Sequence, residues 1–252
     1  MDIFSFIGLF GAMSMILGAF VMEGGNIAGL LAPTAMMIIF GGTVGCVMTS
    51  FPGEEFKHGA MMIKEVFFTK HVNQIEIINK MVELAEKARR EGILSLESYV
   101  HQDDLHPIFA KGLGLAVDGI EVETMREILE REAFLYETQY IVGAEVFEAA
   151  GGFSPTMGVI GTVLGLISVL SNLSDPSSLG PKIAMAFIAT FFGVSFANVV
   201  WLPFSNKLRN RSKELKNTHD IIIQGILSIQ AGENPRVIKD KLNLTLLEKL
   251  HH

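Results

Sequence analysis

The chain has 252 residues, of which 49% are hydrophobic and 19% are charged, with a mean hydropathy of +0.40 and a formal net charge of −7. This hydropathy is too high for an ordinary soluble domain. A single cysteine excludes an intramolecular disulfide and any CxxC metal or redox motif. The acidic balance offers no basic stripe for phosphates, so we expect no nucleic-acid partner.

Four windows of the sequence contain no Asp, Glu, Lys or Arg, and each is long enough for a helix that crosses about 30 Å of hydrocarbon. The windows are residues 3–22, 24–53, 149–174 and 183–206. We predict membrane-spanning helices near residues 3–22, 29–50, 153–172 and 184–204. A buried soluble core is the alternative, which four such windows disfavour. The first window lacks a basic leader and continues through Glu23 into a second apolar run, so we interpret it as a retained helix.

Lysine and arginine mark the cytoplasmic side of a membrane protein. Ten lie in residues 52–150 and nine in residues 205–252, whereas the two short connections hold only Lys182. The sequence therefore predicts that both termini and both polar segments are cytoplasmic. The predicted organisation is a hairpin of spans 1 and 2 at 1–51, a cytoplasmic helical domain at 52–150, a second hairpin at 151–206 and cytoplasmic helices at 207–252.

The polar segments have helical periodicity. Apolar residues recur at three- and four-residue spacing from Val72 to Ala88, with Gly92 as the expected terminator. A second pattern starts at Val122 and predicts a long helix that enters the membrane almost continuously. Residues 205–230 predict an exit helix. No strand alternation is present, so we predict an all-α membrane protein with four transmembrane helices and a large cytoplasmic helical domain.

The Ala231-Gly232-Glu233-Asn234-Pro235 sequence should separate the exit helix from a last short helix. Asn234 is the expected N-cap, with Pro235 at the first helical position. The six glycines within residues 1–29, together with Gly158, Gly161 and Gly165 in the third window, predict that spans 1 and 3 pack closely on other helices.

Enzyme chemistry has no support in the sequence. There is no nucleophile–base set, phosphate-binding Gly-rich loop or HExxH motif, so we expect no catalytic residues and no cofactor. His101 and His106 lie beside Asp103 and Asp104, but a solvated loop is favoured over a metal site because the ligand spacing is unusual.

The predicted spans contain no carboxylate. Cation transport normally needs an ionisable group at membrane depth. The spans offer hydroxyls instead: Thr43, Thr49, Thr156, Thr162, Ser168, Thr190 and Ser195. The residues leave two possibilities open: the chain is not a transporter, or another polypeptide supplies the carboxylate.

Five stretches of the sequence carry a recognisable pattern: residues 40–43, 89–97, 151–167, 179–193 and 201–208. Together they resemble the MotA/PomA flagellar stator family over essentially the whole chain. The related ExbB/TolQ proteins share the pattern of the last two spans but usually have three spans, so the extra hairpin favours MotA. The main alternative is an ExbB/TolQ-type proton-channel energiser of a periplasm-spanning partner, and a membrane structural protein is a third possibility.

The resemblance implies a stator in the bacterial cytoplasmic (inner) membrane that conducts H⁺ or Na⁺. It implies a single-span partner, MotB or PomB, whose aspartate binds the cation. Family members form a pentamer around a dimer of this partner and push the rotor protein FliG.

Individual positions follow from the motif. Arg89 and Glu97 match the charged pair that meets the rotor, and Arg90 shares the role if the register is shifted by one. Without the resemblance, these residues would be solvated surface charges.

Pro155 and Pro235 match prolines that couple ion binding to the cytoplasmic domain, although both also fit simple helix starts. Thr162 and Thr190 match pore-facing threonines, although hydroxyl-to-backbone bonding is their ordinary role. Thr162 favours Na⁺, whereas Ala189-Thr190 resembles proton-driven members, so the ion stays open.

Overall fold

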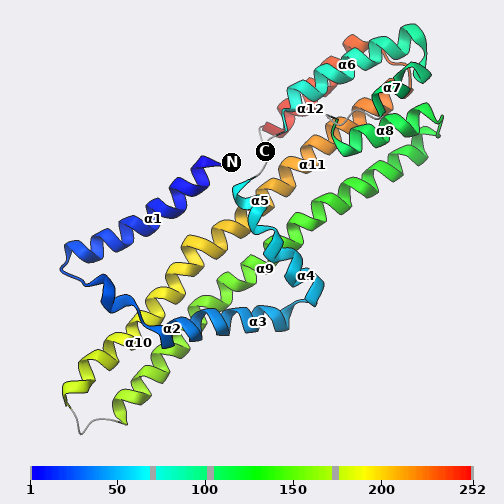
Figure 1. The fold of residues 1–252 in the computed structure, drawn as a ribbon. Coiled ribbons are helices and arrows are strands. Elements are labelled where there is room, and N and C mark those ends of the chain that lie inside the picture. The colour runs from blue at the N-terminus through cyan, green and yellow to red at the C-terminus, as the bar shows by residue number, and fades with distance from the viewer. Residues whose placement is uncertain (1, 69–71, 101–104, 172–175, 251–252) are drawn as a thin grey trace. The chain divides into compact units, whose positions relative to one another are not determined.

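The computed structural model of the chain describes residues 2–68, 72–100, 105–171 and 176–250. Regular structure in these ranges is helical, without a strand (Figure 1). Packing divides the chain into two compact units. The membrane unit comprises Met1–Lys70 and Tyr140–Asn210, and the polar unit comprises His71–Gln139 and Arg211–His252. This division follows contacts and not a membrane surface, so the predicted segment boundaries at 51, 150 and 206 stay predictions.

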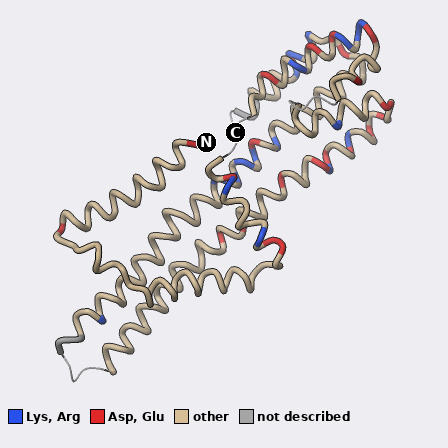
Figure 2. The backbone as a smooth tube through the Cα atoms, in the orientation of Figure 1, with Lys and Arg blue, Asp and Glu red and all other residues tan. Residues whose placement is uncertain are grey.

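Four helical stretches of the described chain are long and apolar enough to cross a membrane. They are Ile3–Met22, Pro33–Ser50, Val122–Leu170 and Leu179–Gln230. Figure 2 shows long runs without charged residues along the membrane unit, whereas the polar unit carries many charges of both signs. The prediction of an all-α chain with four apolar spans is confirmed.

The first hairpin contains α1 (Ile3–Met22) and a broken second span. Ile27–Leu30 forms a 3-10 turn, so the second span begins at Pro33 and not at the expected residue 29. Its helices are α2 (Pro33–Met36), a π-helical segment (Met37–Gly41) and α3 (Gly42–Ser50). Pro33 suits the first helical position because it has no N–H to leave unpaired.

The third span is part of one continuous helix, α9 (Val122–Leu170), which has 49 residues. This confirms the prediction of a long helix that enters the membrane almost continuously, and the helix passes through Gly151-Gly152 without a break. In hydrocarbon, a broken helix would leave backbone groups without hydrogen-bond partners, and this favours continuity over local propensity.

The fourth span also runs further than expected. It begins as α10 (Pro176–Phe196), earlier than the predicted residue 184. A π-helical segment, Ala197–Trp201, then leads directly into α11 (Leu202–Gln230). The predicted exit helix is therefore a continuation of the span.

Two short helices, α4 (Gly53–Met61) and α5 (Ile63–Phe67), follow the first hairpin in the membrane unit. The start of α1 is attached to them, because Asp2 N–H donates to the Phe67 carbonyl at 2.9 Å. The Lys207 ammonium pairs with the Asp2 carboxylate. No residue of α1 is buried within the chain.

The polar unit packs four helices with parts of α9 and α11. They are α6 (Gln74–Glu91), α7 (Glu97–Val100), α8 (Pro107–Val117) and α12 (Pro235–Leu250). Its core includes Met81, Phe109 and Ile226. Gly92 ends α6 with a φ of +86°, where a side chain would be strained. The Asn234 side chain accepts from the Arg236 N–H at 3.0 Å, which confirms the predicted start of α12.

Candidate ion pathway

The third and fourth spans cross at two glycines. A Cβ on Gly193 would lie 3.0 Å from the Gly158 Cα and 2.6 Å from the Ser154 carbonyl oxygen. Both neighbours are backbone atoms, so no rotamer change could make room. Glycine at both positions therefore lets α9 and α10 approach closely.

The close approach continues along α9. A Cβ on Gly161 would lie 2.6 Å from the Ala189 Cβ, and one on Gly165 would lie 2.6 Å from the Ala186 Cβ. With Gly158, this confirms the predicted packing of all three glycines on another helix. That helix is α10 of the same chain. The same prediction for the first span finds no counterpart within the described chain, because nothing lies within 4 Å of a Cβ on Gly8, Gly11 or Gly18 of α1.

Ser154 adds a hydrogen bond at this crossing. Its side chain is 0% exposed, and its hydroxyl donates to the Gly193 carbonyl at 2.9 Å. The sequence analysis missed this residue. Ser154 lies four residues before Gly158, so both are on one face of the helix. This spacing could have indicated that Ser154 also meets the neighbouring helix.

The predicted threonines come together in the membrane unit. The hydroxyl oxygens of Thr162 and Thr190 are in direct contact. Thr162 Oγ1 also donates to the Ala186 carbonyl at 3.0 Å and lies 3.1 Å from the Gly158 carbonyl oxygen. The site is therefore a group of neutral oxygens between two tightly packed spans.

Neutral oxygens can replace part of the hydration shell of a hard cation, but they supply no charge. The charge-free windows that hold Thr162 and Thr190 contain no carboxylate. A proton or sodium ion at this depth needs an ionisable partner to be stabilised. The site in this chain is chemically incomplete for ion transfer.

The two predicted coupling prolines lie in different units. Pro155 is inside α9 and not at a helix start, so the simple N1 interpretation of Pro155 is wrong. Its missing N–H removes the usual hydrogen bond to the Gly151 carbonyl. Pro235 is the first residue of α12, as expected from the sequence.

The predicted rotor-contacting charges lie around the end of α6 in the polar unit. Arg89 and Arg90 are in its last turn, and Glu97 begins α7. Arg90 pairs with Glu86 at 3.1 Å. Arg89 and Glu97 are both exposed, and no ion pair joins them.

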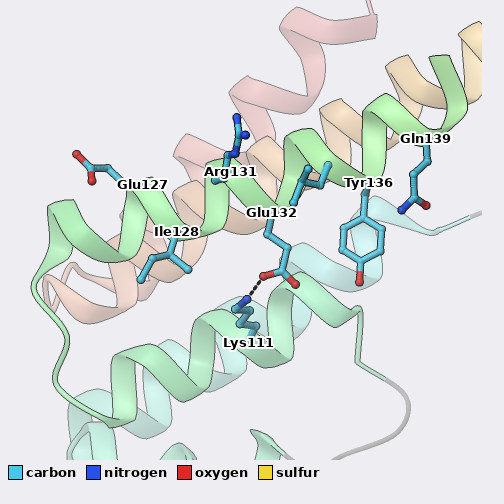
Figure 3. Close-up of a pocket in the computed structure, with 8 residues that line it drawn as sticks. Lys111, Glu127, Ile128, Arg131, Glu132, Tyr136 and Gln139 are labelled. Atoms are coloured by element: carbon cyan, nitrogen blue, oxygen red, sulfur yellow. Dashed lines mark ion pairs between the residues drawn. The ribbon is translucent and has the colours of Figure 1, made fainter. Parts of the chain in front are cut away.

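The polar unit also has an open cavity of about 770 Å³ between α8 and α9 (Figure 3). Two acidic and two basic side chains line it, with one ion pair between Lys111 and Glu132. Its charges therefore balance, and none of the site residues predicted from the sequence lies in it. The lining residues are Lys111, Glu127, Ile128, Arg131, Glu132, Leu135, Tyr136 and Gln139.

The described residues contain no group of three or more His, Cys, Asp or Glu side chains that could hold a metal ion. Of the histidine–aspartate group weighed from the sequence, His106 precedes α8. His101, Asp103 and Asp104 lie outside the described residues.

The comparisons with known proteins agree with this architecture. Residues 6–92 match the family model for the motility protein A N-terminal region, and residues 101–221 match that of the MotA/TolQ/ExbB proton channel family. Motility protein A of Bacillus subtilis is 37% identical over 251 residues, which cover 99% of this chain and 92% of that protein. The chain belongs to the MotA/PomA family.

Two further relatives support this assignment. Chemotaxis protein PomA of Vibrio alginolyticus is 34% identical, with 98% of this chain and 96% of PomA covered. A chain of the flagellar MotAB stator complex from Bacillus subtilis superposes with a TM-score of 0.89 at 36% identity, covering 96% of this chain and 95% of that chain. The chain is a MotA-like membrane subunit of a flagellar stator. The ExbB/TolQ alternative is supported at the level of the shared channel family only.

Proposed function

We propose that the chain conducts H⁺ or Na⁺ together with a MotB- or PomB-like single-span partner. The observation that carries this proposal is the contact between Thr162 and Thr190 in spans that lack a carboxylate. The partner's aspartate would supply the missing charge. The solved Bacillus subtilis relative is titled a MotAB complex, which supports such a partner.

The proposed assembly is a pentamer of this chain around a partner dimer in the bacterial inner membrane, with both termini cytoplasmic. The lysine and arginine distribution supports this orientation. Ion flow would turn the pentamer against the rotor protein FliG. One unit of charge moving through 100 mV releases about 2.3 kcal/mol, so either ion can drive the same motion.

The test of the pathway is ion flux in vesicles that contain the chain and its co-expressed partner. Replacing the partner aspartate with asparagine should abolish flux. Thr162→Val with Thr190→Val should reduce flux strongly, whereas Thr49→Val, whose hydroxyl bonds within its own helix, should not. Unchanged flux in the double variant would overturn the role of the threonine pair.

The identity of the ion is tested separately. Swimming speed is measured with and without Na⁺ at a fixed membrane potential. A sodium-driven stator stops without Na⁺, and a proton-driven stator continues.

We propose that Arg89, Glu97 and, by register, Arg90 contact FliG. The exposure of Arg89 and Glu97 supports this role, because such side chains are free to meet a second protein. Arg89→Glu with Glu97→Lys should leave membrane insertion intact and impair swimming. Partial rescue by reversed charges on FliG would support direct contact, whereas normal swimming in the double variant would exclude it.

We propose that Pro155 provides a flexible point within α9 and that Pro235 orients α12, so that ion binding is transmitted to the polar unit. Pro155→Ala should restore the backbone hydrogen bond and stiffen the helix. The expected result is ion binding without torque. Full torque in this variant would contradict the coupling role.

A further inference from the structure

The last helix of the polar unit, α12, exposes an apolar face. Its inner face packs on α6 through the core residues Ile238 and Leu242. Val237, Leu244 and Leu247 lie on the opposite face, which we call the outer face of α12, and each is more than half exposed. A row of large apolar side chains on a surface marks a contact with another molecule.

The open cavity between α8 and α9 is long enough to receive this face (Figure 3). On α9, its lining extends from Glu127 to Gln139, which is about 18 Å along the helix. The apolar row of α12 extends from Val237 to Leu247, which is about 15 Å. A helix that lies in a groove with apolar anchors one turn apart is a recurring mode of recognition between proteins.

The residues of α9 and of the outer face of α12 match level by level. Each helix presents an apolar residue, a charged residue three positions later and an apolar residue four positions after that. If the two helices lie parallel, apolar residues meet at two levels and opposite charges meet at the level between them. The matched pairs are Ile128 with Val237, Arg131 with Asp240, and Leu135 with Leu244.

The charges at the middle level are available to a partner. Arg131 and Asp240 are exposed, and no ion pair joins either of them to another described residue. One turn earlier, Glu127 on α9 corresponds to Arg236 on α12, so the complementarity recurs with the signs exchanged. Opposite charges on facing helices select the partner and its orientation, and like charges disfavour other alignments.

A chain cannot place its own α12 in its own cavity. Figure 1 shows α12 and α9 on different sides of α11, and both run in the same direction within the polar unit. Rotation about an axis along these helices preserves their direction, so α12 of a neighbouring copy would lie parallel to α9. A contact between two different surfaces of one chain is head-to-tail, and repetition of it can close a ring.

We propose that the outer face of α12 of one copy binds the α8–α9 cavity of the next copy in a head-to-tail ring. The proposal rests on the assembly of several copies described under the proposed function, and it names the surfaces that join their polar units. It depends neither on the transported ion nor on the rotor.

Cysteine cross-linking tests the contact in membranes that contain the full-length chain and its co-expressed partner. Cys46 is the only cysteine, so Cys46→Ser provides a background without thiols. In that background, Leu135→Cys with Leu244→Cys should give disulfide-linked dimers and larger oligomers on mild oxidation. Either substitution alone should give none, because a head-to-tail contact does not bring equal positions together.

The matched control replaces the α12 position with one outside both surfaces. Ile75 of α6 is 60% exposed and Leu244 is 61% exposed, so a thiol is equally accessible at either position. Leu135→Cys with Ile75→Cys should therefore give no linked copies.

Charge reversal tests the alignment of the two helices. Arg131→Glu or Asp240→Arg alone would bring like charges together, and each should lower the yield of linked copies about fivefold or more. The two reversals combined restore opposite charges and should recover most of the yield. Both side chains are exposed, so helix content by circular dichroism should be unchanged in all three variants.

Native mass spectrometry of the purified complex separates this proposal from the assembly on which it rests. A complex of several copies in which positions 135 and 244 do not link would overturn the contact and leave the assembly in place. One copy per complex would overturn both. Dimers from Leu244→Cys alone, linkage of Leu244→Cys to another protein, or no recovery in the combined reversal would also overturn the contact.

Discussion

The Ser154 hydroxyl donates a hydrogen bond to the Gly193 carbonyl at 2.9 Å, where two membrane spans meet through glycine. Ser154 lies eight residues before Thr162 on α9, a rise of about 12 Å along the helix. The bond therefore helps to set the position of α10, and with it Thr190, relative to α9.

Ser154→Ala should weaken the packing of the two spans by about 1 kcal/mol, the size of an interhelical hydrogen bond in a membrane. The measurement is the thermal unfolding midpoint in mild detergent. Ser171→Ala is the matched control, because its exposed hydroxyl donates to the Ile167 carbonyl in the last turn of α9 at 2.9 Å and to no other span. Equal midpoints for the two variants would show that the Ser154 bond contributes nothing.

Gly193→Ala should be more disruptive than loss of the serine hydroxyl. Its new Cβ would meet backbone atoms at 2.6 and 3.0 Å, and relief requires separation of the helices. Overpacking of this kind costs about 1–3 kcal/mol. We expect a lower unfolding midpoint and reduced ion flux in vesicles.

Gly152→Ala in α9 is the control for that substitution, because nothing lies within 4 Å of its Cβ position. Alanine has a higher helix propensity than glycine, so this variant should be neutral or slightly stabilising. A Gly193→Ala protein that matches it would contradict the tight crossing.

Local patterns predicted much of this fold. Charge-free windows identified all four spans, and Gly92 and Asn234-Pro235 gave correct helix boundaries, because these signals act over a few residues. A long helix that enters the membrane almost continuously was predicted from Val122, but the position of Pro155 inside that helix, and not at a helix start, was not. Local propensity there opposes a helix, and membrane burial and tertiary packing outweigh it.

The candidate site, like the fold, was predicted only in part from the sequence. Glycine spacing predicted that α9 packs on another helix, but not which one, so the Ser154–Gly193 bond could not be anticipated. The roles of Arg89 and Glu97 came from the family resemblance alone. Their exposure is consistent with these roles, and the charge-reversal experiment with FliG tests them.

The Thr43 side chain is an exception to the rule that buried polar groups are hydrogen-bonded. Its side chain is 2% exposed, and its hydroxyl has no hydrogen-bond partner among the described residues. A buried hydroxyl without a partner costs about 1–3 kcal/mol. Thr43→Val removes this group with little change in shape, and we expect a higher unfolding midpoint.

Thr49→Val in the same helix is the control. The Thr49 hydroxyl is exposed and donates to the Cys46 carbonyl at 2.8 Å, so its removal relieves no such cost. Its midpoint should change little. A fall in stability or assembly for Thr43→Val would indicate that the Thr43 hydroxyl bonds to another chain in the complete stator.

Two histidines of the polar unit should make it sensitive to acid. The rings of His106 and His219 lie 5.2 Å apart, and His219 Nδ1 is 3.0 Å from the Glu137 carboxylate. Burial is the main cause that lowers the pKa of each histidine to about 4. The His219 charge contributes to the lowering for His106, the Asp220 charge opposes it for His219, and the Arg211 charge contributes a smaller part for both. Other groups that face the pair or share the His106 cavity are Tyr136, Asp220, Glu76 and Lys80.

In the unfolded chain, both rings titrate near 6.5, so between pH 6.5 and about 4 the unfolded state binds more protons than the folded state. Unfolding free energy should therefore fall as the pH drops through this window, by roughly 3 kcal/mol per histidine once it is crossed.

His106→Asn removes one titrating ring and supplies a favoured N-cap for α8. It should remove about half of the acid sensitivity. Hydrogen exchange of α8 and α11 amides at about pH 7 and about pH 5 measures the effect, and identical acid sensitivity in His106→Asn and the unaltered chain would refute it.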